Sequence, residues 1–205
     1  MNFLRRFPHK LYKVQISATC FTLILILISI PQHQQDIMEL KQQINQILMT
    51  SNYSGTFSLK IFDFENRLTS AESFGNFGNE IAGEPFFSSY YGYKMRLLIK
   101  LDQGGSGFPG YMGVYIILMR SDHDGMLSWP FKKSCVFSVI DQEDDEQCRM
   151  DHGVALDPKG QIGFRRPQQD ENTGLGCKQF ISHSKLRTRR YIKDNTVYIQ
   201  VQIQQ

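Results

Sequence analysis

Short segments with apolar residues at every second position recur along most of this chain. TFSLKIF places Phe57, Leu59 and Ile61 on one face, and the closing segment TVYIQVQIQ alternates in the same way. A period of two is the signature of a strand with one buried face. CVFSVID also alternates, whereas YKMRLLIKL and YMGVYIILM are longer apolar runs, typical of central strands buried on both faces.

These segments are separated by glycine, proline and acidic turns, and no long helical pattern intervenes. Strands that follow one another through short turns pair antiparallel, because a parallel pair needs a long crossover. The sequence therefore predicts an all-β chain, an antiparallel β-sandwich of about eight strands over residues 53–204. We expect only two short helical turns in it, near 124–128 and near 184–189.

A helix is predicted over residues 36–50, before the first strand. Ile37, Leu40, Ile44 and Ile47 repeat at spacings of three and four, as along the seam of a coiled coil. Asp36 is placed to act as an N-cap or first-turn acid. The pattern predicts oligomerisation through this seam, and the alternative is an amphipathic helix packed on its own domain.

Residues 1–30 differ from the rest of the chain. Arg5, Arg6, Lys10 and Lys13 precede an apolar run from Ile16 to Ile30. This layout is typical of a signal peptide or a short signal anchor, which would bring residues 16–30 into contact with a membrane. Two alternatives stay open, an erroneous first exon and a buried helix.

The composition and the motifs argue against several classes of function. The net charge is only +3, and the one dense basic run, 185–193, is short, so we do not expect nucleic acid as a partner. Cys20, Cys135, Cys148 and Cys177 form no CxxC pair and are expected to be reduced and mostly buried. No histidine spacing or nucleophile elbow stands out. The sequence predicts no metal, no cofactor and no enzymatic activity.

Three segments have simple interpretations. GSGFPG at 105–110 has the spelling of a dinucleotide motif, but a proline and a strand follow it, so a hairpin loop is expected. The acidic segment 141–147 lacks the oxygen spacing of a calcium loop and is expected to be a charged turn. The basic run 185–193 is expected to be a solvated helix end or loop.

Several strings along the sandwich carry a family resemblance. YSGTFSLKIFDF, YYGYKMRLLIKL, YIILMRSDHDGMLSWPFKKSCVFSVIDQ, FRRP, GLGCKQFISHSKL and YIKDNTVYIQV occur in this order. Together they resemble the C-terminal TRAF or MATH domain of the TNF receptor-associated factors, over Tyr53 to about Val201. The resemblance implies that Trp129 fills the gap beneath a turn between two strands.

The resemblance also implies a function. Members of the family are trimeric signalling adaptors of TNF-receptor, Toll-like and ubiquitin pathways, and they bind extended receptor or adaptor tail peptides at the sandwich edge by a form of strand addition. The chain has no cysteine array for the RING that relatives often add, so we expect it not to be a ligase itself. Self-association or assembly with other family members is expected, in the cytoplasm.

Carried over position by position, the peptide site departs from the family pattern. The arginine that meets an acidic ligand residue falls at Leu98, with Arg96 two places earlier, and its companion tyrosine falls at Lys100. Strand alternation puts these three residues on one face, so an acidic peptide is expected to meet Arg96 or Lys100, about tenfold to a hundredfold more weakly than usual. The remaining positions fall at Gly104, Tyr115, Gln161, Ile162, Gly163 and Leu175.

Two alternatives to the adaptor hypothesis remain. The first alternative is a sandwich that has lost peptide binding. If the groove still binds peptides, Ile162 predicts a more apolar pocket than in many relatives. A membrane-anchored or secreted MATH module is the other, supported by the basic and apolar N-terminus and by the glycosylation sequon Asn52-Tyr53-Ser54. The two locations differ in whether Asn52 is glycosylated.

Overall fold

The computed structural model describes residues 30–44, 55–74, 80–102, 108–158 and 161–204. The chain divides into two compact units, Met1–Leu48 and Met49–Gln205, which are described separately here. The predictions for residues 1–29, for Ile47, for Asn52 and for Gly104 lie outside the described residues. Within the described ranges, no helix has the length and the apolar character needed to cross a membrane.

In the first unit, residues 30–44 are helical, and every one of them is exposed. The predicted start at Asp36 is wrong, because residues 30–35 are already helical. Asp36 instead accepts a hydrogen bond from Nε2 of Gln32, one turn earlier, at 3.0 Å. Side-chain pairs at this i,i+4 spacing stabilise the interior of a helix. Ile37, Leu40 and Ile44 are 53%, 56% and 53% exposed, so residues 30–44 do not bury this part of the predicted seam.

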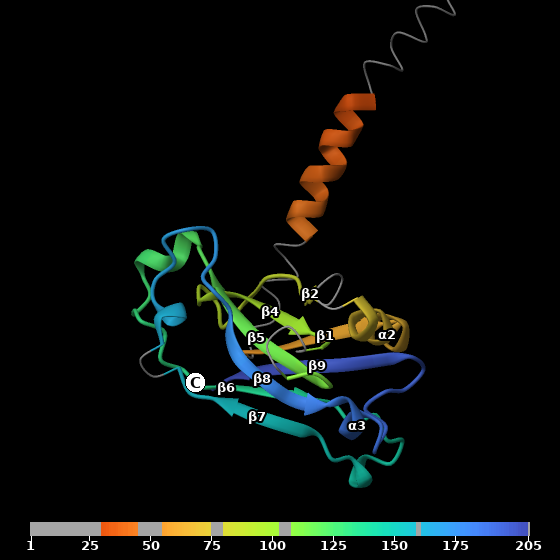
Figure 1. The fold of residues 1–205 in the computed structure, drawn as a ribbon. Helices are drawn as coiled ribbons and strands as arrows, with labels where there is room; N and C mark the ends of the chain where they lie inside the picture. The colour runs from red at the N-terminus through yellow and green to blue at the C-terminus, as the bar shows by residue number, and fades with distance from the viewer. Residues whose placement is uncertain (1–29, 45–54, 75–79, 103–107, 159–160, 205) are drawn as a thin grey trace, which may run out of the picture. The chain divides into compact units, whose positions relative to one another are not determined.

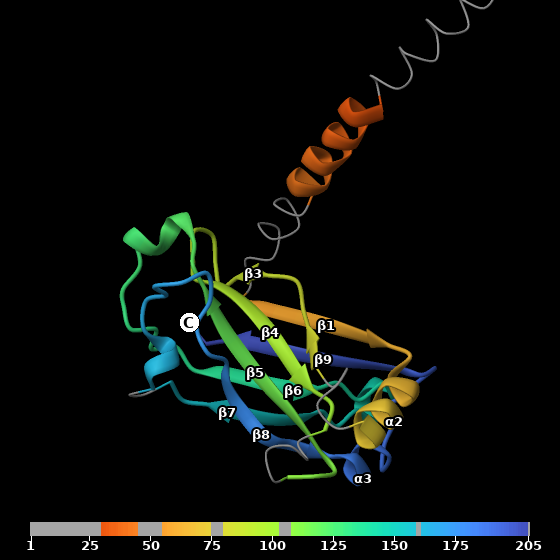
Figure 2. The same cartoon turned by 45° about the horizontal axis from the view of Figure 1, so that its top comes forward.

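The second unit is a sandwich of two antiparallel sheets (Figures 1 and 2). One sheet has the order β1-β9-β6-β7, and the other has the order β2-β4-β5-β8 with β3 paired to β4. The strands are β1 (Thr56–Phe62), β2 (Glu80–Ala82), β3 (Phe86–Phe87), β4 (Lys94–Lys100), β5 (Tyr111–Met119), β6 (Cys135–Val139), β7 (His152–Leu156), β8 (Leu175–Ser182) and β9 (Thr196–Ile203). The predicted fold class is confirmed.

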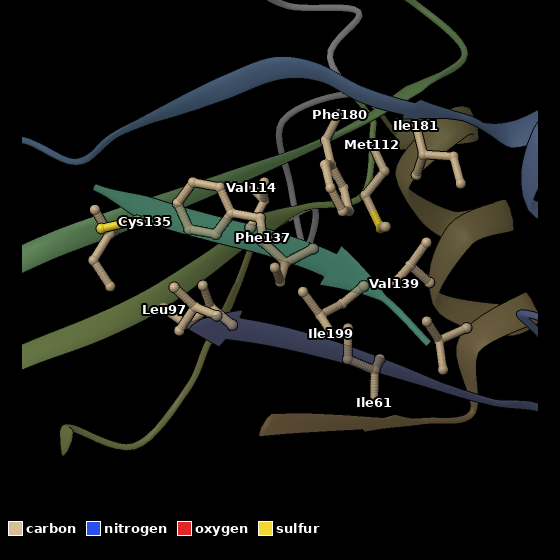
Figure 3. Close-up of a cluster of buried hydrophobic side chains, with 14 of the residues drawn as sticks. Ile61, Leu97, Met112, Val114, Cys135, Phe137, Val139, Phe180, Ile181 and Ile199 are labelled. Carbon is tan, nitrogen blue, oxygen red and sulfur yellow. The ribbon is translucent and has the colours of Figure 1, made fainter. Parts of the chain in front are cut away.

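The core lies between the two sheets, where the inward side chains of both meet (Figure 3). On β9, Val197, Ile199, Val201 and Ile203 are all buried, as the alternation predicted. β5 is buried on both faces, but β4 is not, because alternate residues of β4 are only half-buried on its outward face. The prediction that YKMRLLIKL is a strand buried on both faces is therefore wrong.

The helical content of the sandwich was underestimated. Two short turns do occur, η2 (Asp122–Gly125) and α3 (His183–Leu186), but the 11-residue helix α2 (Phe64–Phe74) was not predicted. Two further 3-10 turns are η3 (Glu146–Cys148) and η4 (Ile162–Phe164). In α2, Phe64, Leu68 and Ala71 recur at helical spacing and are completely buried.

The start of α2 is capped by a residue from the far end of the chain. Asn195, just before β9, accepts hydrogen bonds from the backbone N–H groups of Phe64 through its carbonyl, at 3.0 Å, and of Glu65 through its side chain, at 2.8 Å. Orphan N–H groups at a helix start need such acceptors. Because β1 and β9 are paired antiparallel, the end of β1 lies beside the start of β9, so this cap is available only in the folded chain.

The two charged segments that were expected to be solvated are partners of each other. Asp141, on the turn between β6 and β7, is 1% exposed and accepts a 2.6 Å hydrogen bond from Arg189 Nε. Asp144 pairs with Arg190 and Lys193. The acidic segment is thus not only a charged turn, and the basic run is not only a solvated loop.

The same turn joins the strings DQ and YIKDNT. The side-chain amide of Gln142 donates to the carbonyl oxygens of Tyr191 and Thr196, at 2.8 and 2.9 Å. The Tyr191 hydroxyl in turn donates to the carbonyl of Met150 at 2.9 Å. These contacts give both strings a structural role at one end of the sandwich.

Trp129 is half-buried on the connection between β5 and β6. Its indole N–H donates to the carbonyl of Asp124 at 3.0 Å, and its ring meets that of Tyr93 edge-on at 5.0 Å. The peptide bond to Pro130 is cis. The indole packs on the core under the η2 connection, where it was expected, although it stays partly exposed.

Candidate functional site: the outer face and free edge of the second sheet

The outer face of β4 carries three of the predicted ligand residues. Arg96, Leu98 and Lys100 alternate with Met95, Leu97 and Ile99, which are completely buried in the core. On this face Leu98 lies directly opposite Tyr115 of β5, and Arg96 lies opposite Ile117. The prediction that the three residues share one face agrees with the burial pattern of the strand.

Tyr115 and Ile117 form the apolar centre of this face. They are 9% and 6% exposed although they lie outside the core between the sheets. The Lys100 ammonium lies 5.8 Å from the centre of the Tyr115 ring, and long cationic side chains of this kind cover apolar surface with their stems. We call Leu98, Tyr115 and Ile117 the apolar strip.

Beyond β5, two glycines leave the sheet bare. A Cβ atom on Gly176 would lie 1.9 Å from the carbonyl oxygen of Val114, and one on Gly174 would lie 3.1 Å from Ile117 Cγ1. Any side chain at Gly176 would therefore push β8 away from β5. Gly176 lies opposite Tyr115, so no side chain of β8 separates Tyr115 from the sheet edge at this point.

A turn stands beside this edge. η4 is anchored by Phe164, which is buried and whose backbone carbonyl accepts from the Phe131 N–H at 2.8 Å. The side-chain amide of Asn172 donates to the carbonyl oxygens of Gly163 and Arg165, both at 2.8 Å. Held in this way, the turn leaves the side chain of Ile162 73% exposed.

The predicted ligand residues do not all share one surface. A Cβ on Gly163 would lie 2.7 Å from Leu175 Cδ1, so these two positions touch. Leu175 pairs with Ile116 and packs on the core, on the opposite side of the sheet from Tyr115. Gln161 and Ile162 adjoin this contact through the η4 turn, and Gly104 lies outside the described residues. The site therefore has two parts, the outer face and the η4 turn at the edge.

Two of the three cations on the outer face of β4, Arg96 and Lys100, already have acidic partners, and the third is Lys94. Lys100 Nζ lies 2.6 Å from Glu80 Oε1 of the neighbouring strand β2. Arg96 Nη1 lies 3.4 Å from Glu171 Oε2, and Glu171 belongs to the segment that leads into β8. Sequence reasoning missed both glutamates, because β2 is too short to show a period and Glu171 lies 75 residues from Arg96.

The thiols of the sandwich are not poised for nucleophilic chemistry. Burial raises the pKa of Cys135 to about 12 and also raises the pKa of Cys177, so both thiols stay protonated near neutral pH. Cys135 is buried, Cys177 is half-buried and Cys148 is exposed, so the prediction of mostly buried cysteines is wrong for Cys148. Among the described residues, no group of three or more His, Cys, Asp or Glu side chains could hold a metal ion.

The fold and the site together define a β-sandwich interaction module. A family model for the TRAF/meprin MATH domain matches residues 78–200. TNF receptor-associated factor 1 from Mus musculus is 29% identical over 183 residues, which cover 81% of this chain and 43% of that protein. TNF receptor-associated factor 2 from Homo sapiens is 30% identical over 164 residues, which cover 78% of this chain and 31% of that protein.

A solved structure shares the fold. Notothenia coriiceps TRAF5 superimposes with a TM-score of 0.70 at 24% identity, over 93% of this chain and 96% of that one. This chain belongs to the TRAF/MATH family, and its sandwich is an adaptor-like TRAF domain. The chain spans less than half the length of these two curated relatives.

Proposed function

We propose that this chain is a TRAF-type signalling adaptor module that binds extended tail segments of receptors or adaptors along the β8 edge of its second sheet. The observation that carries the proposal is the bare stretch at Gly174 and Gly176, beside Tyr115. A sheet edge offers unpaired backbone groups to an added strand. Because the glycines have no side chains, those of a ligand have a free path from this edge onto the outer face.

The usable part of the edge is limited at its far end. His152 of β7 lies with its Nε2 atom 2.8 Å from the carbonyl oxygen of Phe180, and its Nδ1 atom lies 2.9 Å from Lys185 Nζ. His152 thus ties the second half of β8 to the other sheet at Phe180, beyond Gly174 and Gly176. We infer that a ligand strand pairs with the first half of β8, beside the η4 turn.

The test is a titration of the full chain with acidic, glutamine-centred and aromatic-ended tail peptides, measured by calorimetry. Leu98→Arg adds a cation at the centre of the outer face and should strengthen the binding of acidic peptides by about tenfold or more, since a hydrogen bond to a charged group contributes about 1.5–3 kcal/mol. Phe62→Arg is the matched control, because Phe62 is 58% exposed on the other sheet. If no peptide binds to wild type or to Leu98→Arg, the proposal is refuted.

We further propose that the seam of Ile37, Leu40, Ile44 and Ile47 joins three chains, either copies of this one or other family members. In the described part of the seam, three large apolar side chains are more than half exposed, and a stripe of this kind is stable in water when it is buried between helices. Wild type is expected to have three times its monomer mass of 23.8 kDa in light scattering at tens of micromolar.

The variant Ile37→Glu/Ile44→Glu should be monomeric, because charges at seam positions would be buried in the trimer. Gln35→Glu/Gln42→Glu, also on this helix and away from the seam, should leave the mass unchanged. If wild type has the mass of a monomer, the proposed trimer is contradicted. The peptide titration would still test the proposed peptide binding independently.

For location, we propose the cytoplasm, with membrane contact if residues 16–30 act as an anchor. There the module would occupy receptor tails of the TNF-receptor or Toll-like type, and full-length partners would supply ubiquitin transfer. An N-glycan on Asn52 would instead place the domain on the other side of a membrane, as the alternative of an extracellular module requires.

A further inference from the structure

Two ion pairs frame the apolar strip on the outer face. Glu80 holds Lys100 at one end, and Glu171 holds Arg96 at the other. The two cations are four positions apart on β4, with three residues between them, so their Cα atoms lie about 13 Å apart at the usual rise of a strand. Leu98 lies midway between them, beside Tyr115. A ligand side chain that reaches the strip therefore meets an apolar centre with a neutralised pair on each side.

Glu171 neutralises the charge of the guanidinium group that an acidic ligand residue would need. Its single contact with Arg96 is long, at 3.4 Å, and the Nε atom of Arg96 is buried without a hydrogen-bond partner. Arg96 thus has donor capacity that Glu171 does not use, and the two side chains are 30% and 43% exposed. An ion pair this long and this exposed contributes little to the free energy of unfolding. Its main effect is to cancel the charge of Arg96.

A carboxylate arriving from a ligand gains little at either end of the strip. At Arg96 it must displace Glu171 or share the cation with it, and at Lys100 it meets Glu80 in the same way. Like charges close together are unfavourable, and the net charge of each pair is zero. An uncharged apolar side chain pays neither cost and gains contact with Leu98, Tyr115 and Ile117.

Building on the proposed function, we propose that this surface selects tail segments that present an uncharged, apolar residue to the strip, and that Glu171 and Glu80 are the residues that select against acidic ones. Two glutamates of the chain itself stand where the carboxylates of an acidic ligand would bind. The selectivity is built from residues of β2 and of the segment before β8, which lie far from β4 in the sequence.

The experiment compares two peptides that differ only in one central residue, leucine or glutamate. Each is titrated into the full chain as wild type, Glu171→Gln and Glu80→Gln/Glu171→Gln. The control is Glu146→Gln, which changes the same charge on the η3 turn between two strands of the other sheet. Glutamine keeps the size of the side chain, and circular dichroism verifies that each variant is folded.

Wild type should bind the leucine peptide at least threefold more tightly than the glutamate peptide. Glu171→Gln should strengthen the binding of the glutamate peptide by roughly threefold and the double variant by roughly tenfold, the range expected for exposed ion pairs. The leucine peptide should bind all variants equally. The gain should disappear at high salt, where exposed charges are screened.

Three results would overturn the proposal. Wild type could prefer the glutamate peptide, the variants could bind both peptides more tightly, or Glu171→Gln could behave like Glu146→Gln. In each of these cases peptides bind and the proposed function stands. If no peptide binds any variant, Leu98→Arg included, the proposed function fails and the selectivity fails with it.

Discussion

Gly176→Ala is expected to destabilise the sandwich by about 3 kcal/mol or more and to abolish peptide binding at the edge. The added methyl group would lie 1.9 Å from the carbonyl oxygen of Val114. A backbone atom in a central strand cannot move aside as a flexible side chain can. β8 must therefore shift away from β5, which separates the edge from Tyr115. Urea unfolding followed by fluorescence of Trp129, the only tryptophan, measures the loss.

Gly125→Ala is the matched control. Gly125 ends the η2 turn, and a Cβ atom there would meet nothing within 4 Å. We expect its free energy of unfolding to stay within about 0.5 kcal/mol of wild type, as for surface substitutions in general. Equal stability of the two variants would show that β8 does not approach β5 as closely as the structure has it.

Asp141→Asn is expected to cost about 3 kcal/mol of stability at neutral pH, in the range for breaking one side of a buried charge pair. The carboxylate of Asp141 accepts from Arg189 Nε at 2.6 Å and from the backbone N–H of Met150 at 3.0 Å. Both donors meet the same oxygen, Oδ2, so an amide that keeps its oxygen there turns its NH2 group toward the Glu143 N–H, which donates to Oδ1 at 3.3 Å in the wild type. Arg189 also loses its counter-charge. Denaturant titration by circular dichroism at pH 7 gives the value.

The same variant should change the acid limb of the stability curve. Burial tends to raise the pKa of Asp141, but hydrogen bonds from Arg189 and from the backbone of Met150 and Glu143 outweigh it and lower that pKa. A carboxyl whose pKa is lower when folded stabilises the protein above its unfolded pKa of about 3.9. This contribution is lost as the pH falls through the folded pKa. The difference between wild type and Asp141→Asn should therefore shrink below about pH 4.

Asp144→Asn is the control for this effect. Asp144 also pairs with basic residues, Lys193 and Arg190, and these lower its pKa, but its side chain is 68% exposed. Water screens such pairs, so the loss of stability should be much smaller than for Asp141→Asn. Equal losses would mean that Asp141 is not buried as described and that the turn is held by surface charge alone.

Two of the strings that carry the family resemblance meet at the turn after β6. DQ and YIKDNT are separated by about fifty residues, yet Gln142 holds the backbone of the second string, and Asp141 holds Arg189, two residues before it. The structure gives each string a mechanical role at one end of the sandwich. None of these contacts involves the proposed ligand edge at β8.

The sequence alone was sufficient for the class of fold and for several strands. The predicted segments TFSLKIF and YMGVYIILM match β1 and β5 to the residue, because alternating or continuous apolar side chains must be buried on one or both faces of a sheet. The outward position of Arg96, Leu98 and Lys100 follows from the same alternation. These features depend only on the order of apolar and polar residues along the chain, which can be read from the sequence.

The tertiary structure decided what depends on distant residues. α2 begins where it does because Asn195, 130 residues away from Glu65, supplies its cap. The segments 141–147 and 185–193 neutralise each other across the chain, and Glu80 and Glu171 pair with Lys100 and Arg96 of the outer face. The spacing of residues along the chain does not predict such pairs, because each pair forms only after the antiparallel strands have paired and brought distant residues close together. The charge of the outer face is therefore a property of the folded sandwich.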